Sequence, residues 1–199
     1  MEGHEDLLER WQAGEDQAGQ QLFAAYFEQI CRFFAFKVEQ ADADDLVQRT
    51  FLNLHRSRGA FRRDASLRTY LFCIARRELH SYVRRKRTRG AEVDFDQVSL
   101  ADLGTSPSQR LARARQVQQL HEALRRLPVD TAVLLELRYW EDCDPAELSE
   151  IFEVPAGAIR QRLLRARRTL REAMDQLGAE AAHDAPADAL VLSISEQDL

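Results

Sequence analysis

Residues 144–174 read DPAELSEIFEVPAGAIRQRLLRARRTLREAM and predict two helices joined by a tight turn. Asp144 is a good N-cap, and Pro145 suits the first position of a helix that should end near Phe152. Pro155 would disrupt a continuing helix but can help to begin a new one. The stretch therefore predicts a helix-turn-helix.

The second helix of this pair has two unlike faces. Its apolar stripe follows helical spacing and consists of Ile159, Leu163, Ala166 and Leu170. Residues 156–171 contain six arginines and no acid, so this helix repels itself unless an anion neutralises it. A solvated basic face is the plainer alternative, but the turn and the charge together favour DNA recognition. The predicted DNA-binding side chains are Arg160, Gln161, Leu164, Arg165, Arg168 and Arg171.

The charge of the chain is distributed in blocks. The net charge of -5 over 199 residues argues by itself against a nucleic-acid partner. However, residues 49–89 carry a net charge of +11 and residues 156–171 a net charge of +6, while the blocks around them are acidic. Two basic blocks on one chain predict two nucleic-acid contacts, with acidic surfaces left for other partners.

Composition limits the other classes of function. The sequence has no long apolar run and no basic-then-apolar N-terminal signal, so we expect a cytoplasmic protein with no membrane insertion. Cys31, Cys73 and Cys143 are far apart and fit no metal spacing, which favours reduced structural thiols. No phosphate-binding glycine loop and no nucleophile with its base is evident, so we expect neither a cofactor nor an enzyme.

The first half of the chain predicts four helices, at 4–11, 17–36, 41–55 and 67–87. On the third of these, Asp45, Gln48 and Leu52 lie on the polar side. A leucine there is either an ordinary exposed leucine or a protein contact, and the sequence leaves both open.

The loop at 58–66 and the helix after it carry most of the first basic block. Phe61 stands beside Arg62 and Arg63, a pattern that suits either an aromatic cradle for an unstacked base or a ring tucked under the loop. The helix at 67–87 combines a buried stripe with a basic side. That side consists of Arg76, Arg77, His80, Arg84 and Arg85.

Helical periodicity is absent between about residues 88 and 108, where the chain is acidic and contains Gly, Ser and Pro. We therefore predict an all-α fold of two small helical domains joined by a flexible acidic linker, the second domain containing the helix-turn-helix. The predicted boundaries are 1–88 for the first domain, 89–107 for the linker, 108–177 for the second domain and 178–199 for an acidic, disordered tail.

Several motifs, in this order, resemble a bacterial sigma factor of the extracytoplasmic function (ECF) group, which keeps regions 2 and 4 of the sigma-70 family. They are DADDLVQRTFLNL at 42–54, LRTYLFCIARRELHSYVRRKR at 67–87, LPVDTAVLLELRYWED at 127–142 and ELSEIFEVPAGAIRQRLLRARRTLREAM at 147–174. The resemblance extends from about residue 7 to residue 174, and no single motif carries it.

This resemblance implies a promoter-specificity subunit of RNA polymerase. Asp45, Gln48 and Leu52 would dock on the beta-prime coiled coil of the core enzyme, and the second domain would meet the beta flap. The loop and helix at 59–87 would read the minus-10 element as a single strand, and the recognition helix would read the minus-35 element as duplex. The resemblance also implies an acidic linker that enters the RNA channel, a protein that is monomeric when free and an anti-sigma factor as a further partner.

The sequence departs from the family at several positions. The family usually has other residues where this chain has Tyr70, Arg77, Ser81, Ala132 and Ala158. Base preferences near Arg77 and Ser81 should therefore not be copied from relatives. Two alternatives are a stand-alone helix-turn-helix regulator, which leaves the first domain unexplained, and a sigma-like adaptor that does not initiate transcription.

Overall fold

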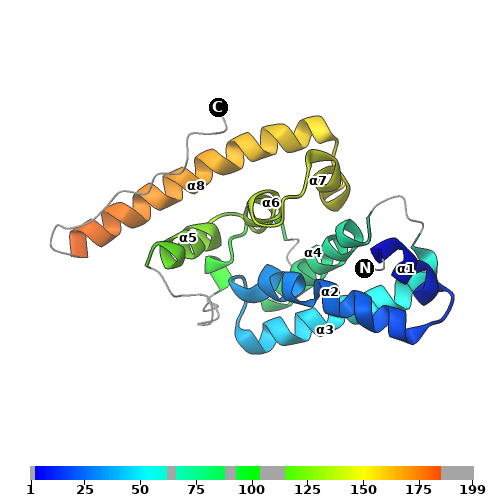
Figure 1. Cartoon of the computed structure of the whole chain (residues 1–199). Coiled ribbons are helices and arrows are strands. Elements are labelled where there is room, and N and C mark those ends of the chain that lie inside the picture. The colour runs from blue at the N-terminus through cyan, green and yellow to red at the C-terminus, as the bar shows by residue number, and fades with distance from the viewer. Residues whose placement is uncertain (1–2, 62–65, 88–92, 104–114, 185–199) are drawn as a thin grey trace.

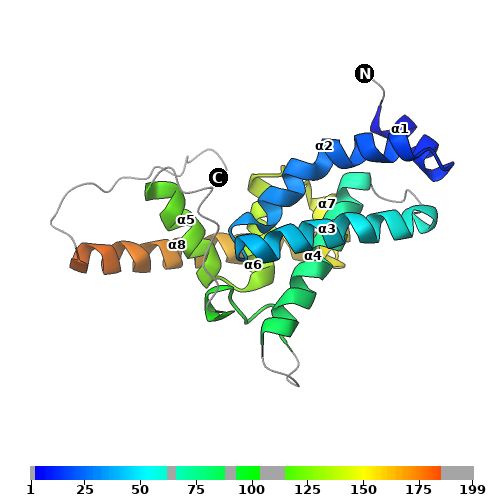
Figure 2. The ribbon, with the colours of Figure 1, turned by 90° about the horizontal axis from the view of Figure 1, so that it is seen from below.

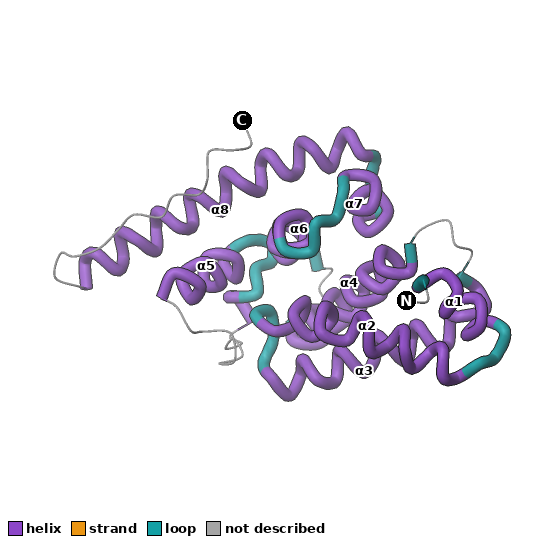
Figure 3. Tube along the Cα trace, in the orientation of Figure 1, coloured by secondary structure: helices purple, strands orange, loops and turns teal. Residues whose placement is uncertain are grey.

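The computed structural model describes residues 3–61, 66–87, 93–103 and 115–184 of the chain, and the regular elements in these ranges are helices. Figures 1 and 3 show two groups of helices, one lying against the other. The first group contains α1 (His4–Gln12), α2 (Asp16–Ala35), α3 (Gln40–Ser57), the 3-10 turn η1 (Arg58–Ala60) and α4 (Leu67–Lys86). The second contains α5 (Arg115–Arg126), α6 (Val129–Tyr139), α7 (Pro145–Phe152) and α8 (Ala156–Asp184), and a 3-10 turn, η2 (Ala101–Leu103), lies between the groups. The all-α prediction and the helix-turn-helix are confirmed.

The first domain is built on the aromatic face of α2. Leu22, Ile30 and Phe34 are almost fully buried there, against α3 and α4. Phe27 extends the same stripe but is 51% exposed and stacks on Phe51 of α3. The apolar face of this helix is thus buried except at Phe27, with Phe23 partly buried.

A glycine allows the first two helices to pack closely. Trp11 of α1 is 1% exposed and lies over Gly19 of α2. A Cβ at position 19 would lie 2.4 Å from the indole Nε1 of Trp11. Gly19 is therefore the residue that lets the indole reach the core.

The second domain buries the predicted stripe of α8. Ile159, Leu163 and Ala166 are buried and Leu170 is partly buried, on a helix that contacts α5, α6 and α7. The helix continues to Asp184, beyond the end near residue 177 that the sequence suggested.

The two domains share one hydrophobic core, a contact that the sequence did not predict. The largest cluster of buried side chains joins α1 to α4 with α6, α7 and the start of α8, and α4 lies directly against α7. Figure 2, seen from below, shows α4 crossing the region where α6 and α7 lie.

Part of the predicted linker belongs to this core. Val98 and Leu100 are buried, and the backbone N–H of Val129 donates to the carbonyl oxygen of Val98 at 2.9 Å. Apolar residues within the acidic sequence thus tie residues 93–103 to the second domain. Within the described ranges, no helix has the length and apolarity needed to cross a bilayer.

Candidate nucleic-acid interface

The helix-turn-helix is fixed by a capping box at the start of α7. The Asp144 carboxylate accepts hydrogen bonds from the backbone N–H groups of Ala146 and Glu147, at 2.7 and 2.9 Å. The Glu147 carboxylate in turn accepts from the backbone N–H of Asp144 at 2.9 Å. These bonds satisfy donors that a helix N-terminus otherwise leaves unpaired, so the start of α7 is sharply defined.

The turn between α7 and α8 is made by a non-glycine residue in the left-handed region. Glu153 has φ 56° and ψ 39° and ends α7. The Ser149 hydroxyl donates to the carbonyl oxygen of Val154 across the turn. This geometry sets the angle at which α8 leaves α7.

The predicted recognition face of α8 is open to solvent. Leu164 is 64% exposed, and the Arg168 side chain is 83% exposed beside Glu172, the acid with which it pairs at 2.9 Å. The other four predicted readers are also exposed: Arg160, Gln161, Arg165 and Arg171. The structure thus brings all six together on one accessible, cationic helix face.

The basic face of α4 is different, because two of its five predicted side chains, Arg76 and His80, are covered by the second domain. Arg76 makes a bidentate ion pair with Asp130 of α6, with Nε–Oδ1 and Nη2–Oδ2 distances of 3.0 and 2.5 Å. His80 Nε2 lies 2.7 Å from the same carboxylate. Arg77 pairs with Glu153 at 2.8 Å, but its side chain is 64% exposed, and Arg84 and Arg85 are exposed as well.

The Asp130 carboxylate is held in its charged form. Burial alone would raise its pKa, but hydrogen bonds from His80 and Arg76 outweigh burial and lower the pKa below the ordinary value of 3.8. The Asp130 anion offers the two basic side chains of α4 a pair of anionic oxygens, which a phosphate group also offers to arginine.

An aromatic side chain of the linker also lies on α4. The rings of Phe95 and His80 are parallel, at 3° and with centroids 3.6 Å apart, and the Arg84 guanidinium lies 5.4 Å from the Phe95 ring centroid. The carbonyl oxygen of Phe95 accepts from the backbone N–H of Asp130 at 3.2 Å. An open pocket beside these contacts is lined by Arg76, His80, Phe95 and Asp130 together with Val93, Asp94 and Asp96.

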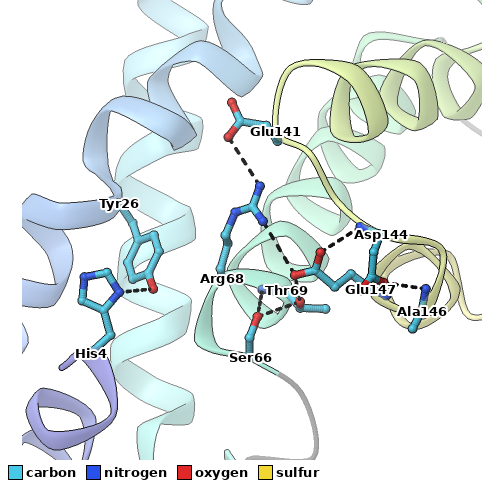
Figure 4. A network of polar contacts seen from close by, with 9 residues as sticks. All are labelled: His4, Tyr26, Ser66, Arg68, Thr69, Glu141, Asp144, Ala146 and Glu147. Atoms are coloured by element: carbon cyan, nitrogen blue, oxygen red, sulfur yellow. Dashed lines mark hydrogen bonds and ion pairs between the residues drawn. The ribbon is translucent and has the colours of Figure 1, made fainter. Parts of the chain in front are cut away.

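Arg68 forms a second polar contact between the domains, shown in Figure 4. This side chain of α4 lies between two carboxylates of the second domain, 3.9 Å from Glu141 and 3.7 Å from Glu147. Glu147, a member of the capping box, also accepts from the Thr69 hydroxyl at 3.2 Å. The N-terminus of α7 is thereby connected to the N-terminus of α4.

A buried ion pair completes the boundary between the domains. The Lys37 ammonium group, fully buried after α2, bonds to the Glu136 carboxylate of α6 and lies 4.1 Å from the ring centroids of Phe33 and Phe36. Burial raises the pKa of Glu136 to about 7, against the attraction of Lys37.

The loop at 58–66, before α4, is described only at residues 58–61 and 66. Phe61 is 9% exposed and packs on Tyr70, with ring centroids 4.8 Å apart, so the ring is buried against α4 in this arrangement. Gln12 donates to the carbonyl oxygens of Arg58 and Phe61 and holds the loop entrance. The predicted contacts Arg62 and Arg63 lie outside the described residues.

The predicted polymerase face of α3 is exposed. Asp45 and Gln48 are exposed together with Leu52, whose exposed fraction is 46%. Asp45 pairs with Arg49 on the same helix at 2.8 Å. An exposed leucine among polar side chains suits a protein contact.

Sequence reasoning missed Asp130, Phe95, Lys37 and Glu136. Their sequence signals were weak: an aromatic residue inside an acidic linker, and single charges within or directly after otherwise apolar helical segments. Only the packing of the domains brings these groups onto α4 and α2.

Comparisons with known proteins match both domains. The family model described as Sigma-70 region 2 matches residues 22–89, and the model described as Sigma-70, region 4 matches residues 117–170. The RNA polymerase sigma-H factor of Pseudomonas aeruginosa is 28% identical over 191 residues, with 91% of this chain and 98% of that protein covered. The ECF RNA polymerase sigma-E factor of Haemophilus influenzae is 25% identical over 179 residues, with 86% of this chain and 95% of that protein covered. The chain belongs to the ECF group of sigma-70 factors.

Two solved structures share the fold of this sigma factor. CnrH, in complex with the cytosolic domain of CnrY, gives a TM-score of 0.64 at 22% identity and covers 85% of this chain and 96% of that one. The sigma factor RpoE of Bartonella quintana, in complex with the anti-sigma factor NepR, gives a TM-score of 0.60 at 22% identity. That match covers 78% of this chain and 96% of that one.

The function of this sigma factor is to bind RNA polymerase core and direct promoter-specific initiation of transcription. Its family consists of non-catalytic initiation factors. A stand-alone helix-turn-helix regulator would leave the match at residues 22–89 unexplained.

Proposed function

We propose that this sigma factor reads the minus-35 element as duplex through the outer face of α8. The observation that carries the proposal is the exposure of all six predicted readers on one acid-free helical segment. Arg160, Gln161, Leu164 and Arg165 would face base edges in the major groove, where arginine can bond a guanine edge with two hydrogen bonds. Arg168 and Arg171 would hold phosphates, which position the helix without reading sequence.

The face of α4 and the loop before it would read the minus-10 element as a single strand. Arg76, Arg77, His80, Arg84 and Arg85 supply charge for the phosphates, and the loop would contribute Phe61, Arg62 and Arg63. In this mode stacking and charge supply most of the affinity. The covered state of Arg76 and His80 requires the domains to separate first.

Asp45, Gln48 and Leu52 of α3 would dock on the beta-prime coiled coil of core polymerase. The support is the exposed fraction of Leu52, on a helix face that the rest of the described structure leaves uncovered. The second domain would meet the beta flap. We further propose that the domains extend over residues 1–88 and 108–177, with the acidic segments 89–107 and 178–199 as linker and tail.

An anti-sigma protein would be the partner of the free chain. The support is the fold shared with a sigma factor that was solved with an anti-sigma factor bound. The protein would act in the cytoplasm as a non-catalytic subunit.

In vitro transcription tests the proposal. Purified protein is added to sigma-free core polymerase on genomic DNA fragments, and transcript starts are mapped. New starts that share two spaced upstream motifs are expected from the wild type and not from an Arg160→Ala/Arg165→Ala variant. Core binding without new starts from the wild type would instead identify a non-initiating adaptor.

A further inference from the structure

Among the described residues, the ion pairs between the two domains have a consistent polarity. Basic side chains come from the first domain and acidic ones from the second, so the acidic face of α6 and α7 lies on the basic face of α4 as a polyanion would. The pairs are Arg32–Glu141, Lys37–Glu136, Arg68–Glu147, Arg76–Asp130, His80–Asp130 and Arg77–Glu153.

The centre of this contact resembles a bound nucleotide in its chemistry. Asp130 offers two oxygens to the fork of Arg76, which is the geometry that arginine also uses for phosphate. Phe95 offers a flat ring to His80 at 3.6 Å between centroids, as a stacked base would. The backbone bond between Phe95 and Asp130 holds this anion and ring as one unit.

The recognition face of α8 lies outside this contact. Leu164, Arg165 and Arg168 are exposed while Arg76 and His80 are covered. The same closed arrangement therefore leaves the α8 contact available and occupies the part of the α4 contact formed by Arg76 and His80.

We propose that Asp130 and Phe95 form an internal competitor that fills the single-strand site of α4, so that the free sigma factor binds duplex DNA but not single-stranded DNA until its domains separate. The proposal rests on the assignment of α4 as the single-strand reader. Opening of the domains and binding of a single strand are then thermodynamically coupled, so that each favours the other.

Binding of a mixed-sequence single-stranded oligonucleotide by the full-length chain, without polymerase, is the first test. Asp130→Asn and Phe95→Ala, alone and combined, should tighten that binding, by ~10-fold if the closed form outweighs the open form by about that ratio. Asp142→Asn is the matched control, because it removes the same charge from an exposed position of the second domain. Binding to a mixed-sequence duplex should change less than about twofold, since α8 is already exposed.

Cys73 provides an independent readout of opening. This partly buried residue of α4 faces α7, with its Sγ 4.0 Å from the carbonyl oxygen of Glu150, and burial raises the pKa of its thiol to about 11. Separation of α4 from α7 should expose the thiol and speed its alkylation, measured by peptide mass spectrometry. In the unmutated protein, saturating single-stranded DNA should speed the reaction and duplex DNA should not, so the test does not depend on a variant that folds.

The proposal is overturned if neither the variants nor single-stranded DNA change the alkylation rate of Cys73. It is also overturned if alkylation speeds up but single-strand affinity does not, because the contact would then cover no strand site. Equal gains for duplex and single strand would show that the contact does not act on α4 selectively. None of these readouts uses core polymerase, so their failure is distinguishable from failure of promoter recognition.

Discussion

The absence of a side chain at Gly19 allows the indole of Trp11 to pack against α2. A methyl group at position 19 would lie 2.4 Å from Nε1 and 2.5 Å from Cδ1 of the indole, well inside van der Waals contact. We expect Gly19→Ala to lower the free energy of unfolding by about 1–2 kcal/mol, because overpacking outweighs the higher helix propensity of alanine.

Urea unfolding of Gly19→Ala beside Gly178→Ala checks this. Gly178 lies in α8, and a Cβ added there would meet nothing within 4 Å, so alanine should be neutral or stabilising by up to about 1 kcal/mol. The same loss from both substitutions would contradict the role of the indole contact.

On α8, two exposed arginines are expected to differ in what they recognise. Arg165→Ala should cost ~1–3 kcal/mol of promoter binding and relax the preference at one base pair, because it removes a base reader. Arg168→Ala should weaken binding evenly across sequences and lower its salt dependence, because it removes a phosphate contact. Equal, sequence-independent losses in a salt series on a panel of duplexes would exclude Arg165 as a reader.

Among the elements, α7 depends most clearly on a single cap. Asp144→Ala removes the acceptor for two backbone N–H groups and should destabilise the protein by about 1 kcal/mol. It also frees Glu147 from the capping box, so the Arg68 contact between the domains should weaken. Thermal unfolding with Asp144→Asn as control is the measurement, because asparagine keeps an acceptor oxygen and should retain most of the stability.

Elements were also the scale at which the sequence was most informative. Asp144, Pro145 and Pro155 mark the ends of α7 and the start of α8, and these local signals act before any tertiary packing. The buried stripe of α8 was equally clear, since its spacing follows the period of a helix. The far end of α8 and the covered side of α4 were less predictable, because what lies on a basic helix face depends on distant parts of the chain.

For the whole molecule, the decisive feature is the charged contact between the domains. The sequence showed basic and acidic blocks, but it could not show that Asp130 would meet Arg76 rather than solvent. Long-range pairing leaves no local pattern, and the spacing of residues within a motif says nothing about a contact between two domains. The burial of Val98 and Leu100 could not be predicted from the sequence for the same reason.

The pH dependence of stability should report this contact. The pKa of Asp130 is lower in the closed protein than its ordinary 3.8, so its contribution is fully present above that value and is lost as the pH falls through the lowered pKa. The basic groups that face it are Arg76 and His80. We expect Asp130→Asn to lower the free energy of unfolding by on the order of 2 kcal/mol near neutral pH.

The difference in unfolding free energy between the wild type and Asp130→Asn, measured with urea across the acid range, isolates this group from the other carboxylates. It should shrink as the pH falls below about 4, where the Asp130 carboxylate becomes protonated. A difference that grows in acid would contradict the assigned direction of the pKa shift.

The positions of the two tryptophans have a spectroscopic consequence. Trp11 is 1% exposed inside the first domain, whereas Trp140 is 48% exposed and directly precedes Glu141, which pairs with Arg32 across the domain boundary. Separation of the domains would change the surroundings of the second indole and leave the first in its core. The protein therefore carries an intrinsic fluorophore next to a residue that pairs across the boundary, and an internal reference for it, so that the proposed opening can be followed in real time without a label.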